Sequence, residues 1–583
     1  MFVARVTEVI AVSVLATVVT AIIAAPVLRA PSERVFGMEI VGRHHDPFTV
    51  MEQFDRPITA GVYSQPVTDI AGALFARVWG AVAAYNWLVL LSFPLSAAAA
   101  YLLARHLTLS PAGAGVAAMA FAFSPFHLAH AAYHPQIAQT QWVPLYFLAL
   151  WRCLDKASPA AVGFLGAAAI AVTLSNFYAG MIAAVMTPIA VAAYWFSDVV
   201  QAFRPARHGG PEGPHYTRME NALIRSANAT GIRELRVTAG ALLFIAAIGI
   251  GYAAYAAGDV VANRTAFAFP RADLFRYSAK WWSYLVPPVE NPLFGTVARR
   301  VWAAAGVREG LLEQQVSLGW GIVALGLIAC GLWLADARAA HRLKRERPGI
   351  LHLPRRSLAA VPILVIVAAA ALFCSLSPER TIGAFVFVRP SALLYTILPM
   401  FRSYARFGVV VQLMAALLAG IGLDYLRRSG RLVFQVVGVV LIALVAAEYS
   451  VFPSALWRDV LPTTAHRWVA DQPGRVRALD CTPLNQESQS VRWLTRDRIV
   501  LRSELPGPGG SSADCISLKA SRILAADGYT HVVVRRDGPD GANGIALAES
   551  GLLPGFRLAA RFDDGVVLAV MAHTADPAPA EQP

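Results

Sequence analysis

The sequence predicts a mostly α-helical, polytopic membrane protein that ends in a small α/β domain. Of the 583 residues, 56% are hydrophobic and only 15% are charged. Several apolar runs exceed the roughly 18 residues that a helix needs to cross a bilayer. Beyond about residue 454 the apolar runs shorten, and Arg, Asp, Gly and Ser become common. We therefore expect a transmembrane module over residues 1–453 and a separate domain over 454–573, followed by a disordered tail at 574–583.

About eleven segments fit an apolar window of membrane-spanning length. The first is too long for a signal-peptide core and is followed by other spans, so we interpret it as a retained helix. The segments are expected near residues 7–28, 82–104, 112–127, 136–153, 159–175, 177–196, 237–257, 317–336, 357–377, 405–426 and 432–452.

The net charge of +13 is assigned to membrane topology, and binding of nucleic acid is not expected. Arg and Lys gather in short loops between the spans, and such loops stay on the cytoplasmic side. If the N-terminus is cytoplasmic, all the basic loops fall on one side. The other side then holds the loops 29–81 and 258–316 and the C-terminal domain, which is predicted to be extracytoplasmic. Long loops on one side of a bundle usually build the functional face.

The C-terminal region has the pattern of a small α/β domain. RVRAL, RIVLRS and THVVVRR resemble short strands, residues 516–526 fit a helix, and FRLAARFDDGVVLAVM fits a hairpin that turns at Asp563-Asp564-Gly565. Cys481 and Cys515 both lie in this region. They can form a disulfide if the domain lies outside the cytoplasm.

The first polar loop is the foremost candidate for a catalytic site. A charged carboxylate near the bilayer is energetically costly, so its presence there indicates a function. Asp46 precedes Pro47, which restricts the backbone there. Such a carboxylate can accept a proton from an attacking hydroxyl or hold Mg²⁺ or Mn²⁺. It can equally be a solvated acid that caps a short helix. Residues that would support it are His44, His45, Glu52 and Asp69.

Polar residues beside later spans are expected to line a cavity. His127 and His130 are three residues apart, which permits zinc on one helix face, but no Cys or HExxH partner accompanies them. Amides in a membrane helix either bond neighbouring helices or bind sugar hydroxyls, and both interpretations stay open. Glu313 is a second cavity acid or a partner of a helix dipole. The candidates are His134, Gln136, Gln141, Asn176, Tyr178 and Glu313.

The segment FRSYARF carries two arginines, Arg402 and Arg406, at the outer end of the tenth predicted span. Their spacing of four residues places both guanidinium groups on one face of a helix, where they can clamp a phosphate. The alternative is that both side chains reach lipid headgroups.

Motifs along residues 1–450 resemble the GT-C superfamily of bacterial membrane glycosyltransferases, especially a group with a soluble C-terminal domain. They include Asp46-Pro47, where many members have Gly-Asp-Pro, and SNFYAG, SYLVPPVENPLFG and EQQVSLGW. Longer matches are YNWLVLLSFPLSAAAAYLLARHL, AFAFSPFHLAHAAYHPQIAQTQWVPLYFLAL and FRSYARFGVVVQLMAALLAGIGLDYL. GYTHVVVRR and FDDGVVLAV resemble the end domain of the same group.

The resemblance implies an inverting enzyme in the bacterial inner membrane. It would transfer a sugar from a polyprenyl-phosphate donor to a glycan, lipid or protein acceptor on the outer face. Asp46 would be the base, and Arg402 and Arg406 would hold the donor phosphate. Two other functions stay open: a flippase for a lipid-linked glycan, although no internal repeat supports it, and a non-catalytic assembly protein.

Overall fold

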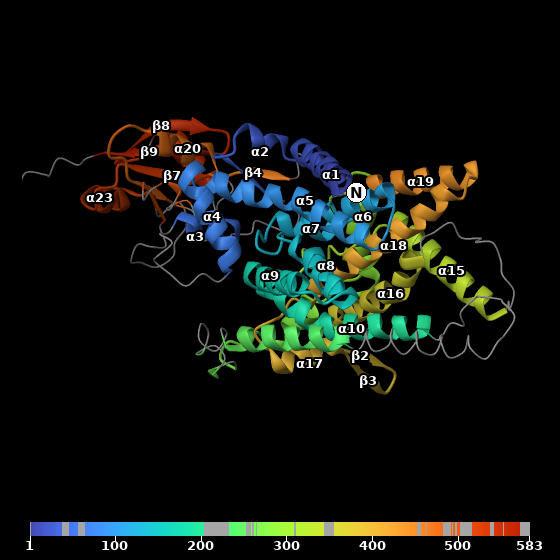
Figure 1. Ribbon diagram of the computed structural model, residues 1–583. Coiled ribbons are helices and arrows are strands. Elements are labelled where there is room, and N and C mark those ends of the chain that lie inside the picture. Colours follow the sequence, from blue (N-terminus) through green and yellow to red (C-terminus); the bar gives the residue numbers. More distant parts are fainter. Residues whose placement is uncertain are drawn as a thin grey trace, which may run out of the picture.

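The computed structural model shows a long helical bundle with a small α/β domain at one end, next to α3 (Asp46–Asp55) and α4 (Pro66–Trp79) (Figure 1). The mostly helical fold class predicted above is confirmed. The structure describes residues 2–37, 46–55, 65–202, 233–251, 258, 262–263, 265–307, 310–342, 355–451, 456–461, 463–481, 491, 494–495, 498–501, 516–536, 541–551 and 553–571.

Each of the eleven predicted segments coincides with a helix. Within the described residues, eight helices are long and apolar enough to cross a membrane. They are α1 (Phe2–Ile23), α5 (Ala81–His106), α10 (Phe177–Ala202), the helix Arg233–Gly251, α15 (Trp320–Arg342), α16 (Arg355–Ser375), α18 (Gly408–Arg428) and α19 (Leu432–Tyr449). The chain is thus a multi-pass membrane protein. Two further predicted spans are the shorter helices α8 (Trp142–Asp155) and α9 (Pro159–Ser175).

The remaining predicted span, 112–127, is a bent pair of helices. α6 (Pro111–Ala122) and α7 (Pro125–Ala131) meet at about 40°. The break follows from Ser124 and Pro125: proline cannot continue the hydrogen-bond ladder of α6. Ser124 Oγ then accepts the His127 N–H at 3.3 Å and caps the new helix. α8 likewise begins at Trp142, six residues later than predicted, so Gln136 lies in a turn before it.

Helix α18 is the centre of the bundle and packs against α15, α6 and α16. Glycines allow these helices to approach closely, as is common between membrane helices. A Cβ on Gly422 would lie 2.1 Å from the Leu325 carbonyl oxygen, and one on Gly420 would lie 2.6 Å from the Gly113 oxygen. Asp424 fixes the crossing by accepting the Ser110 N–H at 2.6 Å.

Contacts between helix ends place three of the five predicted basic loops on one side of the bundle. Asp155, at the end of α8, accepts hydrogen bonds from Tyr194 Oη at 2.7 Å and contacts His106 Nε2 at 2.8 Å. It also pairs with Arg356 at the start of α16. The turns after α5 and α8 therefore meet the start of α16, as the charge pattern predicts. That this side faces the cytoplasm stays a prediction.

The opposite end joins the first loop to the C-terminal region. Strand β1 (Arg34–Phe36), which follows α2 (Ala25–Arg29), pairs antiparallel with β4 (Trp457–Asp459). Asn86 holds β1 onto α5: its Oδ1 accepts the Phe36 N–H at 2.9 Å, and its Nδ2 donates to the Arg34 carbonyl at 2.7 Å. The predicted polar loop thus contains a strand and two helices, which we did not expect.

The later loops at this end are also structured. The first contains α13 (Arg271–Arg276), a 3-10 helix η1 (Trp281–Tyr284) and α14 (Gly295–Ala304). The second contains the hairpin β2 (Glu379–Ile382) and β3 (Phe385–Val388), α17 (Pro390–Ile397) and the 3-10 helix η2 (Tyr404–Phe407). Tyr284 Oη donates to Ser375 Oγ at 2.8 Å and so joins the first of these loops to the end of α16, from which the second loop leaves.

The C-terminal domain is a five-stranded sheet of order β6-β5-β7-β9-β8. β5 (Ala478–Asp480), β6 (Ile499–Leu501) and β7 (His531–Arg535) are parallel, and β8 (Phe556–Phe562) and β9 (Gly565–Val570) form an antiparallel hairpin. These strands lie at the segments that the sequence predicts, and the predicted helix is α23 (Leu518–Ala526). Helices α20 (Thr464–Asp471) and α24 (Gly541–Glu549) complete the domain.

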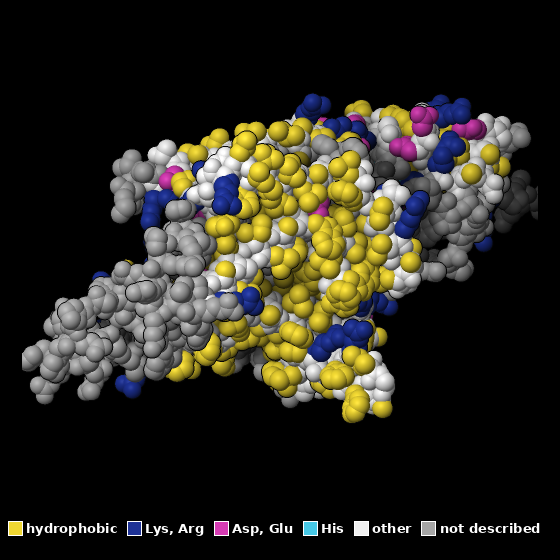
Figure 2. All heavy atoms as spheres, turned by 90° about the vertical axis from the view of Figure 1, so that its right-hand side faces the viewer, with side chains coloured by type: hydrophobic (Ala, Val, Ile, Leu, Met, Phe, Trp, Pro, Cys, Tyr) yellow, Lys and Arg dark blue, Asp and Glu magenta, His cyan; other side chains and the backbone are white. Residues whose placement is uncertain are grey.

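The outer surface of the bundle is strongly apolar. Figure 2 shows hydrophobic side chains spread over most of one face, with Lys and Arg around it. On α19, for example, Val439 is 67% exposed and Leu432 is 75% exposed. Faces of this kind suit contact with lipid chains.

Two glycines of α6 provide a matched test of the packing around α18. We expect Gly113→Ala to lower the thermal stability of the detergent-solubilised protein, because its Cβ would lie 2.4 Å from Asp424 Oδ1 and 2.7 Å from the Gly420 oxygen. Overpacking of this kind costs about 1–3 kcal/mol. Gly115→Ala is the control, since nothing lies within 4 Å of its Cβ. Equal stability of the two variants would contradict the packing described here.

Candidate functional site

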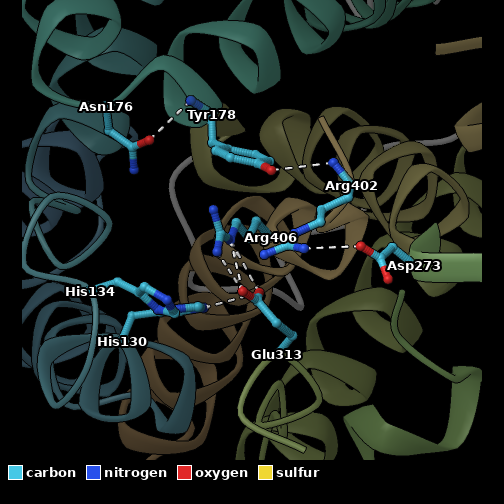
Figure 3. Close-up of polar contacts among 8 residues, drawn as sticks. All are labelled: His130, His134, Asn176, Tyr178, Asp273, Glu313, Arg402 and Arg406. Carbon is cyan, nitrogen blue, oxygen red and sulfur yellow. Dashed lines mark hydrogen bonds and ion pairs between the residues drawn. The ribbon is translucent and has the colours of Figure 1, made fainter. Parts of the chain in front are cut away.

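The polar site lies where three separate parts of the chain meet. α7 contributes His130, the segment before α15 contributes Glu313, and η2 contributes Arg406. Figure 3 shows these side chains pointing toward one another, with Tyr178 and Arg402 beside them. Since the three segments lie far apart in the sequence, the site exists only in the folded bundle.

Glu313 and Arg406 form the central ion pair. Arg406 Nη2 lies 2.5 Å from Glu313 Oε1, and Arg406 Nε lies 3.0 and 3.1 Å from the two carboxylate oxygens. Both residues are buried. Paired bonds of this geometry are among the strongest that side chains make. A buried charge without such a partner would be very unfavourable.

The surroundings hold Glu313 as a carboxylate. Burial by itself raises the pKa of Glu313, but the charge and the hydrogen bonds of Arg406 outweigh it and lower the pKa to about 2. A carboxylate with so low a pKa is a weak proton acceptor at neutral pH. Glu313 therefore suits charge balance in the site better than general base catalysis.

Two histidines extend the cluster on the side of α7. His130 Nε2 lies 3.8 Å from Glu313 Oε2. His130 Nδ1 lies 3.2 Å from Nδ1 of His134, which follows at the end of α7. His130 is buried and His134 is partly exposed. His127, which the sequence pairs with His130, instead contacts Ser92 Oγ at 2.9 Å in a different part of the core.

Tyr178 brings the two arginines together. The Arg406 guanidinium lies 4.2 Å from the centre of the Tyr178 ring, an arrangement that favours a cation. Tyr178 Oη accepts the backbone N–H of Arg402 at 3.2 Å. Asn176 Oδ1 accepts the Tyr178 N–H at 2.9 Å and fixes the start of α10. The predicted residues Asn176 and Tyr178 thus position Arg402 and Arg406.

Arg402 has its own carboxylate partner. Its Nη1 donates to Asp273 Oδ2 at 2.9 Å, and its guanidinium lies 4.3 Å from the centre of the Phe269 ring. The Arg402 side chain is 38% exposed, so this pair is the accessible part of the site. The expected helical spacing of Arg402 and Arg406 is wrong, because η2 is a 3-10 helix and Arg402 precedes it.

Two predicted cavity residues lie outside this cluster. Gln141 is buried and donates from Nε2 to Gln139 Oε1 at 2.9 Å. Gln139 in turn donates to the Pro135 carbonyl at 3.0 Å, so these amides bond within the turn before α8. Gln136 is half-buried in the same turn.

The predicted residues of the first loop are only partly described. Asp46 begins α3, but its side chain lies outside the described residues, as do His44 and His45. Glu52 is exposed on α3. Asp69 is buried in α4, where its Oδ2 accepts Gln53 Nε2 at 2.9 Å and the Gln65 N–H at 2.8 Å. Asp69 therefore holds α3 against α4.

Two further predictions concern groups that the structure describes in part. Cys481 is buried in the core of the C-terminal domain and is disulfide-bonded, whereas Cys515 lies outside the described residues, so its role as the partner stays a prediction. The expectation of Mg²⁺ or Mn²⁺ in the first loop also stays a prediction, since it rests on Asp46.

Sequence reasoning missed Asp273 as part of the site. A single acid in a long loop carries no pattern that links it to an arginine 129 positions later. His130 was noticed only through its spacing to His127. Its real partners, Glu313 and His134, were both predicted as separate cavity residues.

Comparisons with known proteins give likenesses of fold. No protein-family model and no curated protein matches the chain. The structure is similar to the arabinofuranosyltransferase AftD from Mycobacteria, with 14% identity and a TM-score of 0.47 over 96% of this chain. The chain spans 40% of the length of that protein. It is also similar to ArnT from Cupriavidus metallidurans bound to undecaprenyl phosphate, with 14% identity, a TM-score of 0.34 and coverage of 98% of this chain and 99% of ArnT. At these TM-scores neither comparison assigns a role to a residue here.

The central ion pair gives a stability prediction. We expect Arg406→Ala to lower the free energy of unfolding by about 3–5 kcal/mol, because it leaves Glu313 buried without its partner. The combined replacement Arg406→Leu with Glu313→Leu removes both charges and is expected to recover most of that loss. Thermal unfolding of the purified protein in detergent measures both.

Arg402→Ala is the control for this stability prediction. The Arg402 side chain is 38% exposed, and Asp273 keeps a second contact with Arg276 Nη1 at 3.7 Å, so the expected loss is smaller. If Arg406→Ala unfolded no earlier than Arg402→Ala, the buried pair would not have the structural role described above.

Proposed function

We propose that the chain is a membrane glycosyltransferase of the GT-C type. It moves a sugar from a polyprenyl-phosphate-linked donor to a glycan, lipid or protein acceptor on the outer face of the membrane. The observation that carries the proposal is the convergence of Arg402 and Arg406 on Tyr178, at the end of the bundle where the long loops lie. The family resemblance of the sequence supplies the class of reaction.

Arg402 is the group that meets the donor phosphate first. Its side chain is 38% exposed. Its present partner Asp273 binds the guanidinium N–H groups to which a phosphate would bind. Asp273 is buried, but it also lies 3.7 Å from Arg276 Nη1, which remains as its partner when a phosphate takes Arg402. Arg406 stays paired with Glu313 behind Tyr178. Phosphate binding at this place therefore requires Asp273 to move aside.

Asp46 is the proposed base. It begins α3, and Phe48 on the same helix lies 4.9 Å from the Arg458 guanidinium of β4. Arg458 also lies beside Gly37, whose Cβ position is 3.2 Å from the carbonyl oxygen of Ala132 at the end of α7. The beginning of α3 is thus joined through β4 and Gly37 to the helix that carries His130.

The proposed reaction is a single displacement with inversion. The acceptor hydroxyl oxygen attacks the anomeric carbon of the donor sugar from the face opposite the phosphate, and Asp46 accepts the hydroxyl proton. The bond from the anomeric carbon to the phosphate oxygen breaks, and polyprenyl phosphate leaves with the bonding electrons. Arg402 and Arg406 stabilise the charge that develops on this phosphate. The donor arrives on a lipid, so no nucleotide site is expected.

The placement of this reaction follows from the predicted topology. We propose the bacterial inner membrane, with the N-terminus in the cytoplasm and the C-terminal domain outside it. The site lies at the end of the bundle that carries this domain, so both substrates would reach it from the outer leaflet.

The catalytic prediction concerns Asp46. We expect Asp46→Asn to reduce sugar transfer at least about hundredfold, because general base catalysis contributes about 10²–10⁴-fold. Asp55→Asn is the matched control, since it is the same substitution at the other end of α3, where the side chain is exposed. The assay supplies purified protein with radiolabelled polyprenyl-phosphate hexoses and pentoses in membrane extract.

Other outcomes of this assay have a defined meaning. Transfer at the wild-type rate by Asp46→Asn would remove Asp46 from the mechanism and leave the reaction class intact. No transfer from any donor by folded wild-type protein would contradict the proposal and favour a flippase or an assembly protein. Measurement of lipid-linked glycan flux in vesicles would then separate those two.

The phosphate prediction concerns the pair of Arg402 and Asp273. We expect Arg402→Ala to weaken binding of undecaprenyl phosphate about tenfold or more, since a hydrogen bond to a charged group contributes about 1.5–3 kcal/mol. Asp273→Asn frees Arg402 and is expected to tighten binding. Equilibrium binding to the purified protein measures both changes. If the two variants shifted affinity in the same direction, Asp273 would not compete with phosphate.

A further inference from the structure

The cluster of His130, His134 and Glu313 has the composition of a metal site. One ring nitrogen from each histidine and one carboxylate oxygen lie within 4.8 Å of one another. The ligands come from two segments, the end of α7 and the turn before α15, which the fold brings together (Figure 3). We propose that these three residues bind one zinc ion.

The distance between His130 and Glu313 favours a shared cation. His130 Nε2 and Glu313 Oε2 are 3.8 Å apart, which is too long for a hydrogen bond. Two ligands of a tetrahedral zinc ion lie about 3.4 Å apart, given bonds of roughly 2.0–2.1 Å. The three ligand atoms lie within 4.8 Å of one another, so a contraction of at most about 1.4 Å brings them into one coordination shell.

The chemistry of the ligands selects the ion. Imidazole nitrogen suits zinc and other transition metals, whereas Mg²⁺ prefers oxygen ligands. Two histidines and one glutamate are a ligand set found in catalytic zinc sites, which keep a fourth position open. His134 is partly exposed, so the cluster is accessible from outside the core. The site is distinct from a first-loop Mg²⁺ or Mn²⁺ site at Asp46.

One oxygen of the Glu313 carboxylate, Oε2, faces the histidines. Oε1 accepts the two shorter Arg406 bonds, at 2.5 and 3.0 Å. Oε2 receives the longer bond at 3.1 Å and faces His130. A carboxylate can bridge a guanidinium and a metal in this way.

The charges of the site explain what the ion would add. Arg402 with Asp273 and Arg406 with Glu313 are two pairs of opposite charge, so the four groups sum to zero. A zinc ion beside neutral imidazoles makes this region net positive, and anions are then attracted. The metal proposal itself is independent of sugar transfer, and its test uses no donor.

The test measures metal binding directly. Full-length protein with a tag that contains no histidine is stripped with a chelator, loaded with Zn²⁺, dialysed and analysed for metal content. We expect one zinc ion per chain. Loading with Co²⁺ should give the visible absorption of a tetrahedral site with nitrogen and oxygen ligands.

Variants then locate the site. We expect His134→Ala and Glu313→Gln to weaken zinc binding at least tenfold, since loss of an outer partner alone costs 10–100-fold. His531→Ala is the control, because it removes a partly buried imidazole from the C-terminal domain. If Glu313→Gln fails to fold, the partly exposed His134 decides the question alone.

Two results would overturn the proposal. Folded wild-type protein that holds no zinc after loading would contradict it, and the cluster would then be a set of hydrogen-bonded side chains. Equal zinc binding by wild type, His134→Ala and His531→Ala would place the ion elsewhere. Either result leaves the transfer assay, and thus the proposed function, unaffected.

Discussion

The buried ion pair between Arg406 and Glu313 is the constraint on which the polar site depends. Each charge is stable inside the bundle only because the other is present. The pair joins the start of α18, the central helix, to the segment before α15. Tyr178 and the histidines of α7 pack around it. A charged cluster in so apolar a protein thus requires the surrounding helices to hold a fixed arrangement.

The loops at this end of the bundle are built as part of the same arrangement. β1 pairs with β4, and Asn291 donates from Nδ2 to the Ala447 and Glu448 carbonyls at 2.7 and 2.9 Å. Glu448 accepts the Trp320 N–H at 2.7 Å and so caps α15. The segment that carries Glu313 is therefore fixed where α15 begins. Precise placement of this kind is what a site for an anionic lipid needs.

Hydropathy predicted all the membrane helices because the spans are long and apolar, and alternation predicted the strands of the C-terminal domain. The hydropathy window missed the break at Ser124-Pro125, because a mean over many residues hides the effect of one proline. It also missed α3 and α4, whose polar residues resemble a loop. Individual site residues such as Glu313 and Arg406 could be predicted from charge in an apolar context. Their pairing, and the pairing of Arg402 with Asp273, could not, because these contacts join segments about a hundred residues apart.

The central claim is that this charged site receives a polyprenyl phosphate. A structure of the purified protein in lipid nanodiscs with undecaprenyl phosphate tests it most directly. We expect the phosphate within hydrogen-bond distance of Arg402, with Asp273 turned away from that guanidinium. A phosphate bound elsewhere, with the Arg402–Asp273 pair intact, would contradict the account.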